Sequence, residues 1–203
     1  MDLLLTTNLR FHAGNYPIAD MQQIATAAGT SSITTNPTAD YCPPRVLSDI
    51  ALTILAEVNS SYTSGERAFP EQLVTAGCLA LGREPCKSYS GWGVVSEWPR
   101  GTPGKHGGIQ RGSGWYVHAI SQEHGRIRVG QIPGVPAPGN VADGETEASE
   151  DKPVDWQVGS KVRIWPNHAC IAVANFAYFY VVDGEDESRG DKVVDIWTRC
   201  IGW

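Results

Sequence analysis

The chain has 203 residues, of which 41% are hydrophobic, and its formal net charge is −6. This is enough apolar material for one sizeable core, with or without a fragment of a second. With 16 Lys and Arg against 22 Asp and Glu, the chain lacks the broad basic surface that binds nucleic acid, so nucleic acid is not an expected partner.

The first residues, MDLLLTTNLRFHAGN, contain only a short apolar stretch that follows an acidic residue. They have neither the pattern of a secretory signal nor the roughly 20 apolar residues of a membrane span, so no membrane association is expected. The five cysteines of the chain include no CxxC pair. An odd number of cysteines without a secretory signal indicates reduced thiols, and therefore a cytoplasmic protein.

Residues 1–29 predict one β-α unit. Residues 9–17 (LRFHAGNYP) are typical of a short strand that runs into a turn at Gly14-Asn15, and residues 18–29 have helical spacing of apolar residues before a glycine. Because parallel strands need neighbours on both sides, a single β-α unit indicates the tail of a larger α/β domain. Residues 30–48, with three prolines and many small polar residues, predict a linker.

From residue 49 onward the pattern is that of short strands. Apolar residues alternate over residues 50–62, at Leu52, Ile54, Ala56 and Val58, as in a half-buried strand. We predict further strands over 72–82, 159–175, 178–184 and 191–203, and two within 113–129 that meet in a turn near His124. Several short strands with little helix predict a mainly β fold, an antiparallel β-barrel or β-sandwich, over residues 49–203.

Two stretches of this region predict long loops. Residues 99–114 are rich in glycine and basic residues, and residues 133–155 are rich in Pro, Gly and Glu, which is typical of disorder. The first loop contains GTPGKHGG, but it lacks the strand–loop–helix context and the Gly-Lys-Ser/Thr ending of a phosphate-binding loop.

The segment IWPNHACIAV, residues 164–173, places His168 and Cys170 two residues apart in an apolar run that predicts a strand. Side chains alternate along a strand, so both would point to the same face. An imidazole and a thiolate side by side suit Zn²⁺, although a closed structural site would need two more ligands. A cysteine packed as a small hydrophobe beside a hydrogen-bonded histidine explains the same residues, so this pattern alone leaves both explanations open.

The stretch VGSKVRIWPNHACIAVANF, residues 158–176, resembles the V-G-D-x-V-R-x-x-P-N-H-x-C segment of the D-serine dehydratase-like family, which includes D-threonine aldolases. HAGNYPIADMQQ, residues 12–23, resembles the last barrel strand of that family with its Gly-Asn-Tyr turn, and ISQEHG resembles part of its C-terminal β-domain. The resemblance covers most of the chain outside the linker and the two loops. It implies a β-domain like that of alanine racemase, preceded by the remnant of a (β/α)8 barrel.

The resemblance implies a fold-type III pyridoxal 5'-phosphate enzyme. It implies that His168 and Cys170 hold Zn²⁺ close to the cofactor, and that Gly14 and Asn15 lie at the cofactor phosphate, with Tyr16 beside them or at the strand end. Pyridoxal phosphate serves as an electron sink at the α-carbon, and Zn²⁺ assists the departure of a β-hydroxyl. The implied reaction is β-elimination from D-serine, which gives pyruvate and ammonia. A homodimer is implied by the resemblance alone.

Two alternatives stay open. The aldolases of the family usually have aspartate as the second metal ligand, so Cys170 favours a dehydratase over a D-threonine aldolase. The Schiff-base lysine of the family lies near the start of its barrel, and no lysine of this chain has a similar context (Lys87, Lys105, Lys152, Lys161, Lys192). A truncated protein that does not turn over substrate is therefore expected, and a non-catalytic zinc-binding β-domain, or a plain β-domain without metal, is the other alternative.

Other residues near these motifs have simpler explanations as well. His124 in SQEHG is a candidate for proton transfer, and a surface hydrogen bond at the turn explains it equally. Asn167, next to the candidate ligands, can fix the turn rather than contact substrate. Trp165 and Trp197 are most simply aromatic residues of a core or an interface.

Overall fold

The computed structural model describes residues 18–25, 50–62, 65–86, 89–97, 115–130, 156–182 and 192–200. The predicted strand over 9–17 with Gly14, Asn15 and Tyr16, the linker and both long loops lie outside these residues, so the division into 1–29, 30–48 and 49–203 stays a prediction. The described elements are α1 (Met21–Ala25), β1 (Ile54–Tyr62), β2 (Glu71–Val74), α2 (Cys78–Leu81), β3 (Gly93–Glu97), β4 (Trp115–Ile120), β5 (Gly125–Val129), β6 (Lys161–Pro166), α3 (Ala169–Ala174), β7 (Tyr178–Val182) and β8 (Val193–Thr198).

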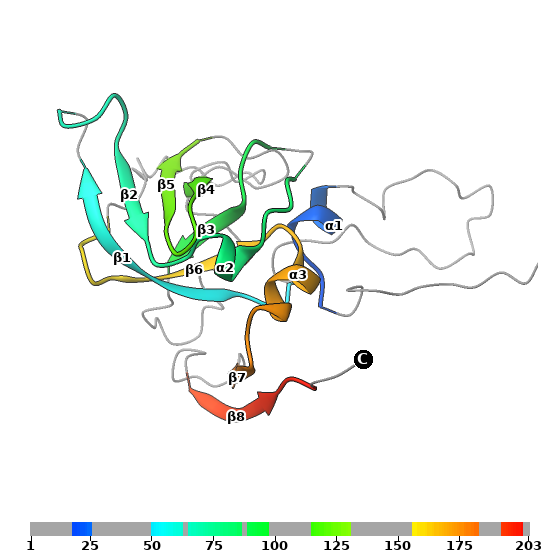
Figure 1. Ribbon diagram of the computed structural model, residues 1–203. Coiled ribbons are helices and arrows are strands. Elements are labelled where there is room, and N and C mark those ends of the chain that lie inside the picture. The colour runs from blue at the N-terminus through cyan, green and yellow to red at the C-terminus, as the bar shows by residue number, and fades with distance from the viewer. Residues whose placement is uncertain are drawn as a thin grey trace, which may run out of the picture.

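Six strands form a closed antiparallel barrel in the order β1-β2-β5-β4-β3-β6 (Figure 1). β6 closes it by pairing with β1 on one side, where Ile54 faces Ile164, and with β3 on the other, where Val94 faces Trp165. This confirms the predicted mainly β fold and selects a barrel over a sandwich. β7 and β8 pair with each other in a separate two-stranded sheet. None of the described helices is long and apolar enough to cross a membrane.

The inside of the barrel is filled by alternate residues of its strands, which we call the barrel core. On β1 the predicted alternation is confirmed, since Ile54, Ala56 and Val58 are buried and Leu55 is exposed. Removing a Val or Ile side chain from water stabilises the fold by about 1.5–3 kcal/mol. The other buried members are Val74, Ala76, Leu81, Val95, Trp115, Val117, Ile127, Trp156, Val162, Ile164 and Ala172.

A second cluster, the outer core, covers the outside of the wall made by β4, β3 and β6. Neighbouring residues of these strands serve the two cores in turn, because side chains alternate along a strand: Val95 and Ile164 point inward, while Val94 and Trp165 point outward. The predicted core role of Trp165 is thus confirmed. The buried members of the outer core are Ala19, Met21, Ile50, Cys86, Tyr89, Val94, Tyr116 and Trp165.

The predicted strand over 72–82 is wrong beyond Val74, because a helix begins at Cys78. Backbone N–H groups of Cys78 and Leu79 donate to the carbonyls of Ser121 and Gln122, at 2.9 and 3.0 Å, so the β4–β5 turn satisfies the start of α2. A Cβ atom at Gly77 would lie only 2.5 Å from the Gln122 oxygen. Glycine therefore permits a close approach between two segments that the local pattern does not reveal.

The predicted strand over 159–175 is also wrong beyond Pro166, where β6 ends and α3 soon begins. Ala169 and Ala172 are buried while Cys170 is exposed, which is the three-residue spacing of a helix. Short apolar runs do not distinguish strand from helix by themselves. The predicted strands over 178–184 and 191–203 exist as β7 and β8, and β3 was not predicted at all although it connects β4 to β6.

Candidate metal centre

His168 and Cys170 lie at the start of α3 and not on a strand. His168 is the N-cap residue, with extended backbone angles (φ −132°, ψ 106°), and Cys170 is the second residue of the helix. The argument that both side chains share one strand face is therefore wrong, because the strand ends before either residue. The pair is still held together, since the two residues flank Ala169 in the first turn of α3.

The two side chains differ in exposure. The imidazole of His168 is half-buried, and its Nδ1 atom is buried without a hydrogen-bond partner among the described residues. Cys170 is exposed and carries a free thiol. A buried ring nitrogen without a partner is costly in a folded protein, and a neutral imidazole has one nitrogen lone pair for a metal. The residues present therefore fit a metal ion that has one nitrogen and one sulfur ligand from this pair.

The described part of the chain offers no group of three or more His, Cys, Asp or Glu residues that could hold a metal ion. A structural zinc site would normally have four such ligands. Within the described residues the arrangement is that of an open site, in which a bound ion would keep positions for other oxygen or nitrogen donors.

Asn167 fixes the chain directly before His168, as the sequence suggested. Its side-chain Nδ2 donates to the carbonyls of Glu84 and Gly91, at 2.9 and 2.7 Å, and its Oδ1 accepts from the hydroxyl of Tyr89. Its backbone carbonyl accepts from the N–H of Gln22, at 3.1 Å. A buried amide with its donors and acceptor all used holds one orientation, so the turn that presents His168 is rigid.

Tyr89 was not singled out from the sequence, because 78 residues separate it from Asn167. Burial, reinforced by the nearby Cys86 thiol, raises the pKa of Tyr89 well above its ordinary value of 10.0. The phenol therefore stays protonated and keeps donating to Asn167. Its ring also packs edge-on against Tyr116, with the ring centroids 6.0 Å apart.

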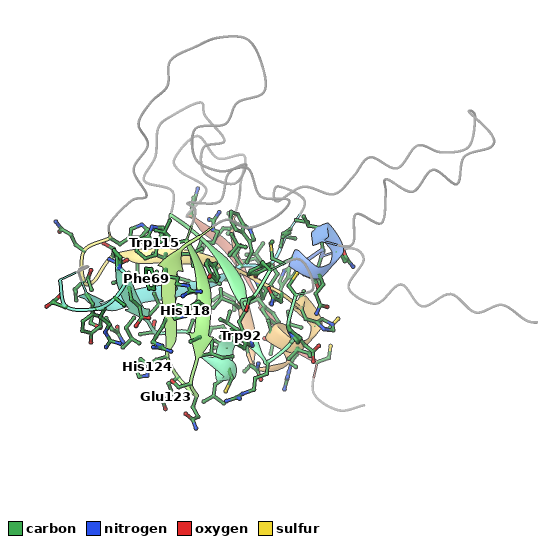
Figure 2. All side chains as sticks on the ribbon, turned by 90° about the horizontal axis from the view of Figure 1, so that it is seen from above. Phe69, Trp92, Trp115, His118, Glu123 and His124 are labelled. Carbon is green, nitrogen blue, oxygen red and sulfur yellow. The ribbon has the colours of Figure 1, made fainter. Side chains whose placement is uncertain are left out.

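His124 lies in the turn between β4 and β5, which Figure 2 shows apart from α3. Its carbonyl accepts from the backbone N–H and the hydroxyl of Ser121, at 2.9 and 3.2 Å. These contacts give His124 a place in the turn through its backbone, whereas a role of its imidazole in proton transfer stays a prediction.

A second polar cluster surrounds Glu71 on the outside of β2. Oε2 of this buried carboxylate lies 2.7 Å from Nε2 of His118 and 3.6 Å from Nη1 of Arg126, and Oε1 lies 3.2 Å from Nη1 of Arg67. Burial lowers the pKa of His118 below its ordinary value, while the hydrogen bond and charge of Glu71 act in the opposite direction. The cluster ties β2, β4, β5 and the β1–β2 connection together, and no sequence motif indicated it.

The fold and the candidate site define a β-barrel domain with a His-x-Cys pair at the first helix after its last barrel strand. Residues 51–182 match the family described as "Putative serine dehydratase domain". Over 98% of its length the chain is 30% identical to the D-serine dehydratase of Schizosaccharomyces pombe and 28% identical to that of Saccharomyces cerevisiae. The chain belongs to this family, which confirms the resemblance found in the sequence.

The chain spans 35% and 36% of the lengths of these two relatives. Among solved structures, D-threo-3-hydroxyaspartate dehydratase from Delftia sp. HT23 matches with a TM-score of 0.51 and 26% identity, over 78% of this chain and 34% of that one. Two mutant forms of D-threo-3-hydroxyaspartate dehydratase match with the same TM-score and 25% identity. One replaces a cysteine by alanine and is metal-free, and the other replaces a histidine two positions earlier.

Proposed function

We propose that this chain is the β-domain of a D-serine dehydratase-like lyase that depends on Zn²⁺ and pyridoxal 5'-phosphate. The proposed reaction removes water and then ammonia from a small β-hydroxy D-amino acid, and converts D-serine to pyruvate. The observation that carries the proposal is the match to the serine dehydratase domain over residues 51–182, which includes the His-x-Cys pair. A cytoplasmic homodimer is part of the proposal.

His168 and Cys170 would hold the metal. The support is the buried Nδ1 of His168 without a described partner, together with the two-residue spacing of the His and Cys substitutions in the solved dehydratase, one of which is metal-free. When bound, Zn²⁺ supplies a Lewis acid for the departing β-hydroxyl and pyridoxal phosphate supplies an electron sink for the α-carbon. Asn167 contributes by holding the turn before His168 in one orientation.

Gly14, Asn15 and Tyr16 would contact the cofactor phosphate. They lie outside the described residues, so their assignment rests on the resemblance of HAGNYPIADMQQ to the family. No lysine of the chain has the context of the family's Schiff-base lysine. We therefore propose that the chain does not turn over substrate by itself, which keeps a non-catalytic zinc-binding domain as the second candidate.

The metal content of the purified chain tests the first part of the proposal. Elemental mass spectrometry should find about one zinc ion per chain, and the His168→Ala/Cys170→Ala double variant should lose it. A His124→Ala/Cys200→Ala double variant removes the same residue types elsewhere and should keep the ion. Equal zinc content in all three proteins would contradict the assignment.

A chimaera tests the reaction. This chain would replace the matching third of the Schizosaccharomyces pombe D-serine dehydratase, and pyruvate would be measured with a lactate dehydrogenase coupling enzyme. We expect pyruvate from D-serine, and none from the chimaera that carries His168→Ala/Cys170→Ala. With D-threonine, acetaldehyde and glycine would indicate an aldolase, whereas 2-oxobutanoate and ammonia would indicate a dehydratase. A chimaera that folds, binds zinc and makes no product would favour the non-catalytic domain.

A further inference from the structure

The carboxylate of Asp20 reaches the starts of two helices. Asp20 is fully buried directly before α1. Its Oδ1 accepts a hydrogen bond from the backbone N–H of Gln23 at 2.9 Å, which is the usual contact of an N-cap residue with the third residue of its own helix. Its Oδ2 accepts from the backbone N–H of Ala169 at 3.0 Å, across 149 residues of sequence. One side chain therefore satisfies donors of both α1 and α3.

The second contact falls at the centre of the candidate metal site. Ala169 separates His168 from Cys170, and the peptide group that carries its N–H also carries the carbonyl of His168. The N-cap residue His168 makes no side-chain capping bond to α3. Because Asp20 takes the N–H of Ala169, the start of α3 is capped without using the imidazole, whose Nδ1 stays without a described partner.

The first turn of α1 holds the turn on both sides of His168. Besides the bond from Ala169 to Asp20, the N–H of Gln22 donates to the carbonyl of Asn167 at 3.1 Å. Figure 1 shows α1 beside the start of α3, at one end of the barrel. Two hydrogen bonds that flank a residue restrict its backbone more strongly than either bond alone, so the direction of the His168 side chain depends on α1.

The backbone before Asp20 is unusual. Ala19 has a φ of 59° and is fully buried. This is the left-handed region, which residues with a Cβ atom adopt only at a cost and which is found most often where the chain must place a functional group. Here that conformation directs the carboxylate of the next residue toward Ala169.

We propose that Asp20 is a positioning residue for the metal centre, which through the amide of Ala169 sets the placement of the His168 imidazole relative to the Cys170 thiol. The inference rests on the proposed metal site. A carboxylate is suited to this role because it accepts from both helices at once, whereas a side-chain amide has only one oxygen. Its negative charge also favours a cation nearby, as in the outer shells of known metal sites.

Cobalt(II) chloride is the probe that tests this, because Co²⁺ bound to a thiolate has a charge-transfer absorption band and Zn²⁺ has no d-electron spectrum. The full chain would be titrated with Co²⁺, and Zn²⁺ affinity would be measured by competition with a chromophoric chelator. We expect Asp20→Asn to lower the Zn²⁺ affinity by about 10- to 100-fold. At saturating cobalt the band should move or weaken, because the thiol no longer has the same placement.

Two further variants separate positioning from folding. Ala169→Pro removes the same hydrogen bond from the donor side, at a helix position that accepts proline and after a residue that is already extended, and it should change the band in the same direction. Glu71→Gln removes another buried carboxylate with three cationic partners, and should lower stability but leave the band and the Zn²⁺ affinity unchanged.

The outcomes are distinguishable. If wild-type protein shows a band that Cys170→Ala abolishes, and neither Asp20→Asn nor Ala169→Pro alters it, the metal centre stands and the role of Asp20 is wrong. If wild-type protein shows no band that depends on Cys170, the metal centre itself is wrong and the role of Asp20 falls with it. If Asp20→Asn and Glu71→Gln change the band equally, Asp20 acts only through general stability and the proposal is overturned.

Discussion

The barrel core and the outer core use the same strands but are stabilised in different ways. The barrel core is almost entirely apolar, and its members alternate along each strand. The outer core combines apolar side chains with the buried polar groups of Asp20 and Asn167, each of which bonds to segments far away in sequence. Apolar burial is nondirectional and tolerates small changes, whereas a buried hydrogen-bonded group allows one arrangement. The candidate metal centre lies beside the core that allows one arrangement.

The largest effect is expected for Asn167→Ala. The change leaves the Tyr89 hydroxyl and the carbonyls of Glu84 and Gly91 without their partner in a buried place, and each such group costs about 1–3 kcal/mol. The free energy of unfolding, measured with urea, should fall by about 3 kcal/mol or more.

Asn175→Ala is the matched control for this prediction, because Asn175 is exposed and donates from its side chain only to the carbonyl of Ile171 among the described contacts. It should change the free energy of unfolding by less than about 0.5 kcal/mol. Similar losses in both variants would mean that the outer core is no more directional than the protein surface.

A smaller effect is expected for Ile164→Val in the barrel core. Ile164 is fully buried on β6, and the loss of one buried methyl group typically costs about 0.5–1.5 kcal/mol. Leu55→Ala on the paired strand β1 is the comparison, because Leu55 is 52% exposed, and it should fall within about 0.5 kcal/mol of wild type. A larger cost for Ile164→Val than for Asn167→Ala would reverse the contrast between the two cores.

The smallest effect is expected for the pH dependence that His118 contributes. Burial lowers the pKa of His118 in the folded state from its ordinary value of 6.5, so protonation favours the unfolded chain. The stability due to the neutral ring is complete above pH 6.5 and is lost as the pH falls through the lower folded pKa. His118→Gln should flatten this part of the curve of unfolding free energy against pH, and an unchanged slope would show that other groups cause it.

The exposed faces of the β7–β8 sheet contrast with both cores. Tyr178, Tyr180, Ile196 and Trp197 are all more than half exposed, although a two-stranded sheet alone is marginally stable in water. The sequence correctly predicted both strands. Their pairing with each other rather than with the barrel depends on which edges the other six strands leave, and a strand pattern contains no such information.

Several features were decided by the residues themselves. Alternation over 50–62 predicted β1, the turn near His124 predicted the hairpin of β4 and β5, and His-x-Cys with its flanking residues indicated the family that the comparison over 51–182 confirms. These signals are local, because the side chains of a strand report its two faces within a few residues. The metal assignment of His168 and Cys170 stays a proposal.

Only the tertiary structure decided how the candidate site is built. Pro166 ends β6, and α3 begins because Asp20 supplies a cap from 149 residues away. Tyr89, Glu84 and Gly91 meet at Asn167 for a similar reason, since each hydrogen bond joins groups whose separation along the chain is large. A helix start with an apolar sequence resembles a strand until the distant group that satisfies its free N–H is known. The residue types of the site are therefore set by the sequence, and their geometry is set by contacts that form only when the outer core closes.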